Sequence, residues 1–380
     1  MIADVGTKTL MPSLRLLADD LTGALDTAAE FAGWCGPLDV AWAGALPTEM
    51  PANLAIDTGT RERDKAHAVA IVEGLVPLLR DATIAYKKAD SLLRGAWAAE
   101  LGACLRSGYW KSCIVSPAFV YQGRRTRGGQ HYAMAQDGNW FPVGDNLLAQ
   151  LAAEDIDARL GRFDAELTDG VHVFDAESDC HLDRVVEIGR RCSSPVLWCG
   201  SGGLAGALAR GRFAGAPSRL RRPVLGLFGS DQAVTTAQLD ACEPVVLTLA
   251  PDDQDSAGRI RQQLVRHDVA LVRFAFACDT SRDAAARRIA GELAALTSQL
   301  DPPGTLMVAG GETLKALCLA VGALGLKVIG RIMPGLPRSV IQGGRWDGVE
   351  VISKSGAFGP PGLWRTLLNE NDLNIERTPS

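Results

Sequence analysis

The stretch that decides the fold is "LLADDLTGALDTAAEF", Leu16–Phe31, in which two adjacent aspartates separate an apolar run from a helical pattern. The residues "LRLLA" predict a strand that ends at Ala18, and the apolar residues after the aspartates recur at helical spacing, with Thr22 as the expected cap. Asp19 and Asp20 would then lie at the carboxyl end of a parallel strand, where open α/β sheets bind ligands. An acidic surface turn, with one aspartate merely capping the helix, explains the same pair equally well.

Composition sets the broad class of the protein. The chain has 380 residues, of which 47% are hydrophobic, and this length favours two domains. A formal net charge of -5 argues against nucleic acid or an anionic membrane as a partner. Nine cysteines without a CxxC pair predict reduced thiols. We expect no membrane span and no export signal, and therefore a cytoplasmic protein.

Short apolar runs alternate with longer amphipathic patterns along the chain, which predicts an α/β fold with largely parallel sheets flanked by helices. The clearest break is "RGRFAGAPSRLRRP", Arg210–Pro223, which is rich in Arg, Gly and Pro. We therefore expect two domains, each with its own sheet, at residues 13–218 and 219–380, with the active site in the cleft between them. The residues before Ser13 are expected to be irregular.

Two further strand ends in the first half carry polar side chains. "TIAYKKADSLLRGAWAAEL", Thr83–Leu101, predicts a strand, a polar loop and a helix that begins near Gly95. "KSCIVSPAFVYQGRRTRGGQHY", Lys111–Tyr132, predicts a strand followed by a basic loop. The candidate ligands in these loops are Lys88, Asp90, Ser91, Arg94, Arg124, Arg125, Arg127 and His131. Guanidinium groups beside carboxylates suit an anionic substrate with hydroxyl groups.

Structural roles compete with each of these assignments. At least one of the arginines in the basic loop is expected to be only solvated, and a lone histidine such as His131 is more often structural. Arg94 could simply pair with Asp90 at the start of the helix. Lys87 is expected to be a surface charge at the end of its strand.

The second half contains four glycine-bearing turns after predicted strands. They lie in "VLGLFGSDQAVTTAQL", "TLMVAGGETLKALCLAVG", "RIMPGLPRSVI" and "VEVISKSGAFGPPG". Glycine lets backbone amides approach a phosphate closely, and a helix N-terminus adds partial positive charge. Four such turns, one of them with Lys354, predict a site for the phosphates of a nucleotide.

Two known nucleotide-binding motifs offer alternatives to this interpretation. "CGSGGLAG", Cys199–Gly206, imitates a dinucleotide fingerprint, but Arg221 and Arg222 occupy the region where an acidic residue should read the ribose. A helix N-terminus packed on a sheet explains this segment better. The chain contains no GxxxxGK[ST] motif, which disfavours an ATPase of the Walker type.

Nine segments, in order along the chain, resemble the four-carbon acid sugar kinase family. The segments are "ADDLTGALD", "DTGTRERDKA", "KKADSLLRG", "SPAFVYQGRRTRGGQHY", "GSGGLA", "FGS…TTAQ", "GGET", "MPGLP" and "KSGAFG". The resemblance implies an N-terminal substrate domain that includes Arg61 and a C-terminal nucleotide domain. It implies ATP contacts at Ser230, Gly310, Gly311, Glu312, Thr313 and Gly356, and Gly335 and Lys354 join them through the glycine turns.

This chain departs from the family pattern on the substrate side. Leu92 replaces a threonine, Val120 replaces a proline, and a different loop follows Tyr132. These changes leave a kinase as the expected class and widen the expected substrates beyond four-carbon acids to branched or oxidised relatives such as 3-oxo-isoapionate.

The expected reaction is in-line transfer of the γ-phosphoryl group of ATP to a terminal hydroxyl of a sugar acid, with Mg²⁺. Asp20 is the predicted base, with Asp19 orienting it or binding metal, although the two could exchange roles; the metal ligands stay open. Arg61, Lys88, Asp90, Ser91, Arg94, Arg124 and Arg127 are the predicted substrate ligands. Rival interpretations are an NADP-dependent oxidoreductase, a non-catalytic sugar-acid sensor and a ribokinase-type enzyme. A homo-oligomer is also left open.

Overall fold

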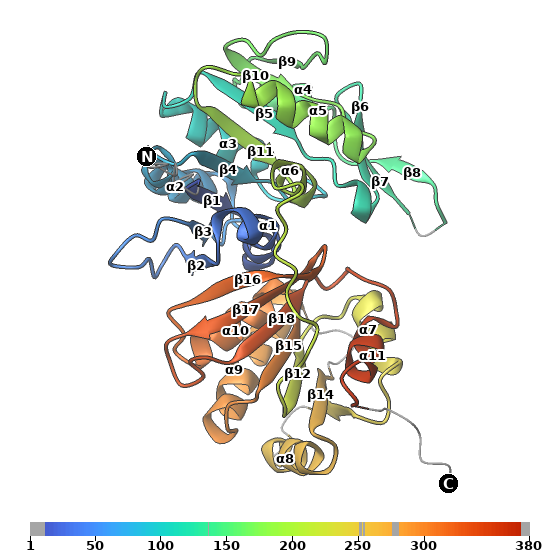
Figure 1. Ribbon diagram of the computed structural model, residues 1–380. Helices are drawn as coiled ribbons and strands as arrows, with labels where there is room; N and C mark the ends of the chain where they lie inside the picture. The colour runs from blue at the N-terminus through green and yellow to red at the C-terminus, as the bar shows by residue number, and fades with distance from the viewer. Residues whose placement is uncertain (1–11, 136, 251–252, 254, 276–280, 374–380) are drawn as a thin grey trace, which may run out of the picture.

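The computed structural model describes residues 12–135, 137–250, 253, 255–275 and 281–373, so the irregular leader expected before Ser13 lies almost wholly outside them. The first half is built on a parallel sheet (Figure 1). Its strands are β1 (Leu14–Ala18), β2 (Leu38–Trp42), β3 (Leu54–Asp57), β4 (Ile84–Lys88), β5 (Ser112–Ser116), β9 (Ala158–Leu160), β10 (Gly170–Val173) and β11 (Val196–Gly200). Its helices are α1 (Leu21–Cys35), α2 (Lys65–Leu75), α3 (Trp97–Arg106), α4 (Leu147–Ala152), α5 (Asp179–Arg190) and α6 (Gly202–Leu208), with 3₁₀ turns at Val76–Leu79 and Val120–Gln122.

The second half adds a parallel group of strands and an antiparallel hairpin. Its strands are β12 (Val224–Phe228), β13 (Val246–Leu249), β14 (Val269–Phe274), β15 (Thr305–Ala309), β16 (Gly325–Met333), β17 (Leu336–Gln342) and β18 (Glu350–Lys354). Its helices are α7 (Ala233–Asp240), α8 (Ser256–His267), α9 (Arg282–Gln299), α10 (Gly311–Ala320) and α11 (Leu363–Asn369). The mostly parallel α/β class predicted from the sequence is therefore confirmed.

The two halves share one sheet, which corrects the expectation of two separate sheets. The fifteen strands follow the order β13-β14-β12-β15-β18-β17-β16-β2-β3-β1-β4-β11-β5-β10-β9. Strand β16 pairs antiparallel with β2, which sets Leu326 opposite Val40 and Val328 opposite Leu38. Helix α1 packs against β16, β17 and α10, so it lies at the junction of the halves (Figure 1).

Burial explains why the stretch around the two aspartates forms a strand and then a helix. Leu14, Leu16 and Ala18 pack into the core beneath α1, whereas Leu17 faces the core on the other side of the sheet. A parallel strand that is covered on both faces reads as a continuous apolar run, as "LRLLA" does apart from its arginine. The polar pair Asp19 and Asp20 follows directly, because it lies beyond the carboxyl end of β1, after the residues that are covered on both faces of the sheet.

Helix α3 begins at Trp97, near Gly95 as expected. Two expectations about local structure are corrected. Helix α1 begins at Leu21 and is capped by Asp20, not by Thr22. The arginine-rich segment is strand β6 (Arg124–Arg127) rather than a loop. It forms a separate antiparallel sheet with β7 (Gln130–Met134) and β8 (Trp140–Pro142), in which the Arg125 guanidinium stacks 4.1 Å from the centre of the Trp140 ring.

Two predictions from composition can be compared with the described residues. Eight cysteines in them are free thiols, and six of these are buried, as expected for small hydrophobic side chains. Within the same residues, no helix is both long and apolar enough to cross a bilayer.

Candidate active site

The two aspartates at the end of β1 have different environments. Asp20 adopts the extended backbone of an N-cap, and its Oδ1 accepts a hydrogen bond of 2.7 Å from the Gly23 amide. Its side chain is 20% exposed, whereas that of Asp19 is 5% exposed. The capping alternative weighed from the sequence is therefore correct for Asp20, and the same carboxylate is also the more accessible of the pair.

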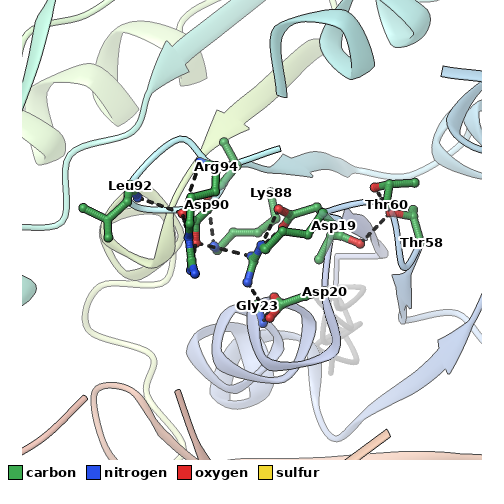
Figure 2. Close-up of polar contacts among 12 residues, drawn as sticks. Asp19, Asp20, Gly23, Thr58, Thr60, Lys88, Asp90, Leu92 and Arg94 are labelled. Atoms are coloured by element: carbon green, nitrogen blue, oxygen red, sulfur yellow. Dashed lines mark hydrogen bonds and ion pairs between the residues drawn. The ribbon is translucent and has the colours of Figure 1, made fainter. Parts of the chain in front are cut away.

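Arg61 binds both aspartates and a third carboxylate, that of Asp90. Figure 2 shows Asp19, Asp20 and Asp90 close to one another. Its Nε and Nη2 atoms donate to the two oxygens of Asp19 at 2.8 Å each. Its Nη1 lies 2.5 Å from Asp20 Oδ2, and its Nη2 lies 3.3 Å from Asp90 Oδ1. The guanidinium thereby holds three like charges together, an arrangement that would otherwise be strongly repulsive.

The Asp20 carboxyl is suited to accept a proton near neutral pH. Burial raises the pKa of Asp20 to about 6, with Asp19 adding to the rise and Arg61 opposing it. A general base works best when its pKa lies near the operating pH. The position at the helix N-terminus and the bond from Gly23 favour the ionised form that a base requires.

Asp90 and Arg94 form a close pair after β4. Arg94 Nε and Nη2 donate to the two oxygens of Asp90 at 2.8 Å each, and the Leu92 amide donates to the same carboxylate at 3.1 Å. Burial alone would raise the pKa of Asp90, but Arg94 and Arg61 outweigh it and hold this pKa below its usual range. The Arg94 side chain is still 52% exposed, so the pairing leaves part of the guanidinium open to a ligand.

In the basic segment, Arg124 lies near Asp90 and Arg94, whereas Arg127 lies near Glu177. Arg124 is electrostatically coupled to Asp90 and Arg94, and burial lowers its pKa. Its Nη1 donates to the carbonyl groups of Gln122 and Gly123 at 2.7 and 3.0 Å. Arg127 is largely exposed and lies 3.7 Å from Glu177, so the structure does not bring it to the group around Asp90.

His131 and Ser91 connect the hairpin to the site. The His131 ring is buried, with Nδ1 3.1 Å from the Thr126 hydroxyl and Nε2 2.9 Å from the Ser91 carbonyl. These contacts fit the structural role that the sequence favoured for this histidine. They also anchor the loop that carries Ser91 against the hairpin that carries Arg124.

The two lysines at the end of β4 are both buried, which corrects the surface position expected for Lys87. Lys87 Nζ lies 2.7 Å from Glu100 on α3, and a buried lysine needs such a partner. Lys88 Nζ donates to the Ala89 carbonyl at 2.9 Å. A Cβ atom placed on Gly23 would lie 3.5 Å from Lys88 Nζ, so this ammonium lies beside the first turn of α1.

The "GGET" turn of the second half lies directly against Asp20. Gly311 is the first residue of α10, and a Cβ atom there would lie 2.6 Å from the Thr22 hydroxyl and 3.2 Å from Asp20 Oδ2. A methyl group does not fit at this distance, which explains the second glycine. The N-terminus of a ten-residue helix from one half is thus packed against the predicted base of the other.

Two other glycine turns, after β12 and β18, meet beside this helix start. A Cβ atom on Gly229 would lie 2.6 Å from the Thr313 hydroxyl, and one on Gly356 would lie 2.4 Å from the Ser230 hydroxyl. Gly310 has a φ of 99°, a conformation that favours glycine. The turns after β12, β15 and β18 therefore pack against one another, and we call this group, Gly229, Ser230, Gly310, Gly311, Thr313 and Gly356, the glycine cradle.

Lys354 and Gly335 both contact residues of the turn after β18. Lys354 is buried, and its Nζ lies 3.0 Å from the Ser355 carbonyl and 3.4 Å from that of Gly356. Burial lowers the pKa of Lys354 to about 7. Gly335 lies in the hairpin turn between β16 and β17, not in a strand-to-helix turn, and a Cβ atom there would press on the Phe358 ring.

The side chains around Asp20 do not form a metal site by themselves. Among the described residues, no group of three or more His, Cys, Asp or Glu side chains could hold a metal ion. Asp19 and Asp90 already accept hydrogen bonds from Arg61 and Arg94. Mg²⁺ is commonly bound through one or two carboxylates together with substrate phosphates. Asp20 Oδ2 likewise lies 2.5 Å from Arg61 Nη1, so each of the three carboxylates is already paired with a guanidinium and none is assigned to Mg²⁺.

The segment "CGSGGLAG" is occupied by close packing. A Cβ atom on Gly200 would lie 2.4 Å from the Ser116 carbonyl, and one on Gly203 would lie 2.2 Å from the Ala118 carbonyl. These glycines let α6 approach β5 and the residues that follow it. The interpretation of this segment as a packed helix start fits the structure, and the dinucleotide interpretation does not.

Several residues at the junction were missed by sequence reasoning. Lys315 of α10 lies 2.6 Å from the Asp57 carboxylate at the end of β3, and Arg331 of β16 pairs with the buried Glu30 of α1. Burial raises the pKa of Glu30 to about 7, with Arg331 opposing the rise. The signal for Lys315 was its position four residues after Gly311, which sets both on one face of the helix.

Comparisons with known proteins identify the two halves. Residues 14–208 match the family of the sugar-binding N-terminal domain, and residues 225–363 match the family of the nucleotide-binding C-terminal domain. The chain is 32% identical to the D-threonate kinase of Bordetella bronchiseptica, over 92% of this chain and 95% of that protein. It is 31% identical to the D-threonate kinase of Cupriavidus necator, over 93% and 96% respectively. The solved structure of Haemophilus influenzae protein HI1011 shares the fold, with a TM-score of 0.69 and 18% identity over 94% of this chain and all of that one.

The chain thus joins a half that matches a sugar-binding domain family to a half that matches a nucleotide-binding domain family. The chain belongs to the four-carbon acid sugar kinase family. The resemblance noted in the sequence is confirmed.

Proposed function

We propose that this protein is an ATP-dependent kinase that phosphorylates a terminal hydroxyl of a small sugar acid. The observation that carries the proposal is the contact between the two halves. The N-terminus of α10, at Gly311, packs on Asp20, whose pKa is raised to about 6. A phosphate donor on the glycine cradle and a hydroxyl acceptor at Asp20 would then meet at one place, as in-line transfer requires.

In the proposed reaction, Asp20 accepts the proton of the substrate hydroxyl as its oxygen attacks the γ-phosphorus of ATP. The bond from that phosphorus to the bridging oxygen breaks, and ADP leaves. Arg61 holds Asp20 in place and keeps Asp19 and Asp90 from repelling it. Mg²⁺, when bound with the nucleotide, would neutralise phosphate charge.

The cradle residues are proposed to bind ATP. Backbone amides of Gly311 and Gly356 would face the phosphates, with the hydroxyls of Ser230 and Thr313 beside them and Glu312 in the first turn of α10. Gly310 would contribute through the shape of the turn, because its amide donates to the Lys354 carbonyl at 2.9 Å. Lys354 would act through the carbonyl groups of the turn that it holds. Gly335 would let the adjoining hairpin approach Phe358.

The substrate carboxylate is proposed to bind the half-exposed guanidinium of Arg94, with Arg124 beside it. Lys88 and Ser91 would face the hydroxyl groups between this end and Asp20. D-Threonate is the first substrate to test, since two relatives that match over nearly the whole chain carry that name. Branched and oxidised acids are tested too, because Leu92 stands where the family pattern has a threonine and so removes a hydroxyl from the substrate side.

The decisive experiment measures ADP formation with ATP and a panel of tetronates, oxo-tetronates and branched sugar acids. We expect at least one acid to give ATP-dependent turnover, together with a phosphorylated product detected by mass spectrometry. Tight binding of an acid without ADP formation would replace the proposal with a sensor. A fluorescence assay of NADP binding tests the oxidoreductase alternative, and we expect no NADP to bind.

A further inference from the structure

The two halves are joined near the candidate site by an ion pair that involves none of the residues predicted to bind ligands. Lys315 Nζ on α10 lies 2.6 Å from Asp57 Oδ2 at the end of β3. The Asp57 side chain is 4% exposed and that of Lys315 is 26% exposed, so water screens this pair only partly. Lys315 Nζ also lies 4.8 Å from the centre of the Trp42 ring at the end of β2.

Both partners are tied to the elements that carry the reacting groups. Asp57 accepts a second bond, 2.9 Å, from the Gly59 amide, and the segment after it leads to Arg61, which binds Asp19 and Asp20. Lys315 lies one helical turn after Gly311, on the same face of α10. The pair therefore connects the helix whose N-terminus meets Asp20 with the strand that precedes the arginine holding Asp20.

We propose that Lys315 is a positioning residue that, through Asp57, sets the distance between the N-terminus of α10 and the Asp20 carboxylate. This inference rests on the proposed kinase function for its kinetic consequence. Lys315 contacts neither reactant in this arrangement. Its loss leaves the cradle and the substrate ligands intact but lets α10 move relative to Asp20. An error of about 1 Å in such a distance is enough to lower turnover by up to roughly a hundredfold.

The chain offers a matched control in a second lysine that also spans the two halves. Lys327 of β16 lies 3.5 Å from Asp39 of β2, and its side chain is 44% exposed. The pair has the same charges and also joins the two halves, but it is more exposed and neither partner lies next to Gly311 or Arg61. Replacing this lysine tests whether any bridge between the halves matters or only the one at α10.

The experiment compares Lys315→Met, Lys315→Arg, Asp57→Asn, the Lys315→Met/Asp57→Asn double variant and Lys327→Met with the unmodified protein. We expect Lys315→Met to lower kcat by about tenfold or more, with the KM values for ATP and sugar acid within about twofold. Asp57→Asn should do the same, the double variant should be no worse than either single change, and Lys315→Arg should recover most of the turnover. Lys327→Met should keep normal kcat.

A second readout does not depend on activity. Hydrogen exchange of the backbone amides of α10 should be faster in Lys315→Met than in the unmodified protein and Lys327→Met. Unchanged kcat or unchanged exchange in Lys315→Met would overturn the positioning role. If the unmodified protein phosphorylates no sugar acid, the proposed function fails, and the exchange comparison alone decides the role of Lys315.

Discussion

The residue with the most consequence is Asp20, because one carboxylate caps a helix, contacts Arg61 and faces the other half of the molecule. Its double role makes asparagine a useful replacement. Asparagine caps helices about as well as aspartate, so α1 should keep its first turn while the proton acceptor is lost.

We therefore expect Asp20→Asn to lower kcat by about 10²–10⁴, the usual contribution of a general base. The dissociation constant for ATP, measured by calorimetry, should change little because the cradle is untouched. The melting temperature should also stay close to that of the unmodified protein. Near-normal kcat in this variant would remove Asp20 from the mechanism.

The pH profile gives an independent test of the same carboxylate. Because burial raises the pKa of Asp20 to about 6, the free protein should hold this group protonated below that pH and ionised above it. We expect kcat/KM for the sugar acid to rise with pH through about 6 and then level off. Asp20→Asn should lose this dependence, and a profile that falls over the same range would contradict the assignment.

At the scale of single elements, the helix starts at the carboxyl ends of strands were the most predictable features. The sequence places Asp19 and Asp20 after β1 and Gly310 and Gly311 after β15, since apolar runs flanked by helical patterns define both ends. The hairpin around Arg124–Arg127 could not be predicted in this way. Its strands contain little apolar alternation, and they are stabilised by contacts between distant residues such as Arg125 and Trp140.

Ion pairs between elements were equally hard to predict. Two consecutive lysines at the end of β4 suggest a surface, and only the fold brings Glu100 of α3 within 2.7 Å of Lys87. The role of Arg61 as the partner of three carboxylates depends in the same way on the meeting of three separate strand ends. Sequence reasoning selected Arg61 and the three aspartates, but it could not predict which of them contact each other.

For the element α10, the close packing of its first residue makes a specific prediction. Gly311→Ala would place a methyl group 2.6 Å from the Thr22 hydroxyl and 3.2 Å from Asp20 Oδ2, so α10 must move away from α1. We expect kcat to fall by about tenfold or more in steady-state assays. Gly291→Ala in α9 is the control, because nothing lies within 4 Å of the added Cβ atom there. Equal activity of the two variants would show that this contact is not needed for catalysis.

For the whole molecule, the decisive feature is the pairing of β16 with β2, which the sequence did not predict. Neither "LDVAW" nor "GLKVIGRIM" carries a mark of its distant partner, and the basic linker at Arg210–Pro223 favoured two independent domains. The order of the two family regions was correct. The boundary at residue 219 stays a prediction, since the shared sheet gives no simple dividing line.

Shared packing should make the two halves unfold together. Helix α1 contacts elements of both halves, and the sheet is continuous between them. We expect one calorimetric transition, with equal calorimetric and van't Hoff enthalpies. Val40→Asp, which buries a charge opposite Leu326, should separate or sharply lower this transition, whereas Val265→Asp at an exposed site of α8 should leave it in place. Two transitions in the unmodified protein would contradict this expectation.

The same pairing has a consequence for biosynthesis. Strand β2 belongs to the part of the chain that leaves the ribosome first, but its neighbour on one side is β16, which is made far later. At about 5–20 residues per second, β16 would be complete on the order of 15–60 s after strand β2 is made, and this edge of β2 would stay uncovered until then. An uncovered strand edge invites pairing with other chains, so this protein should depend on molecular chaperones during translation more than its folded form suggests.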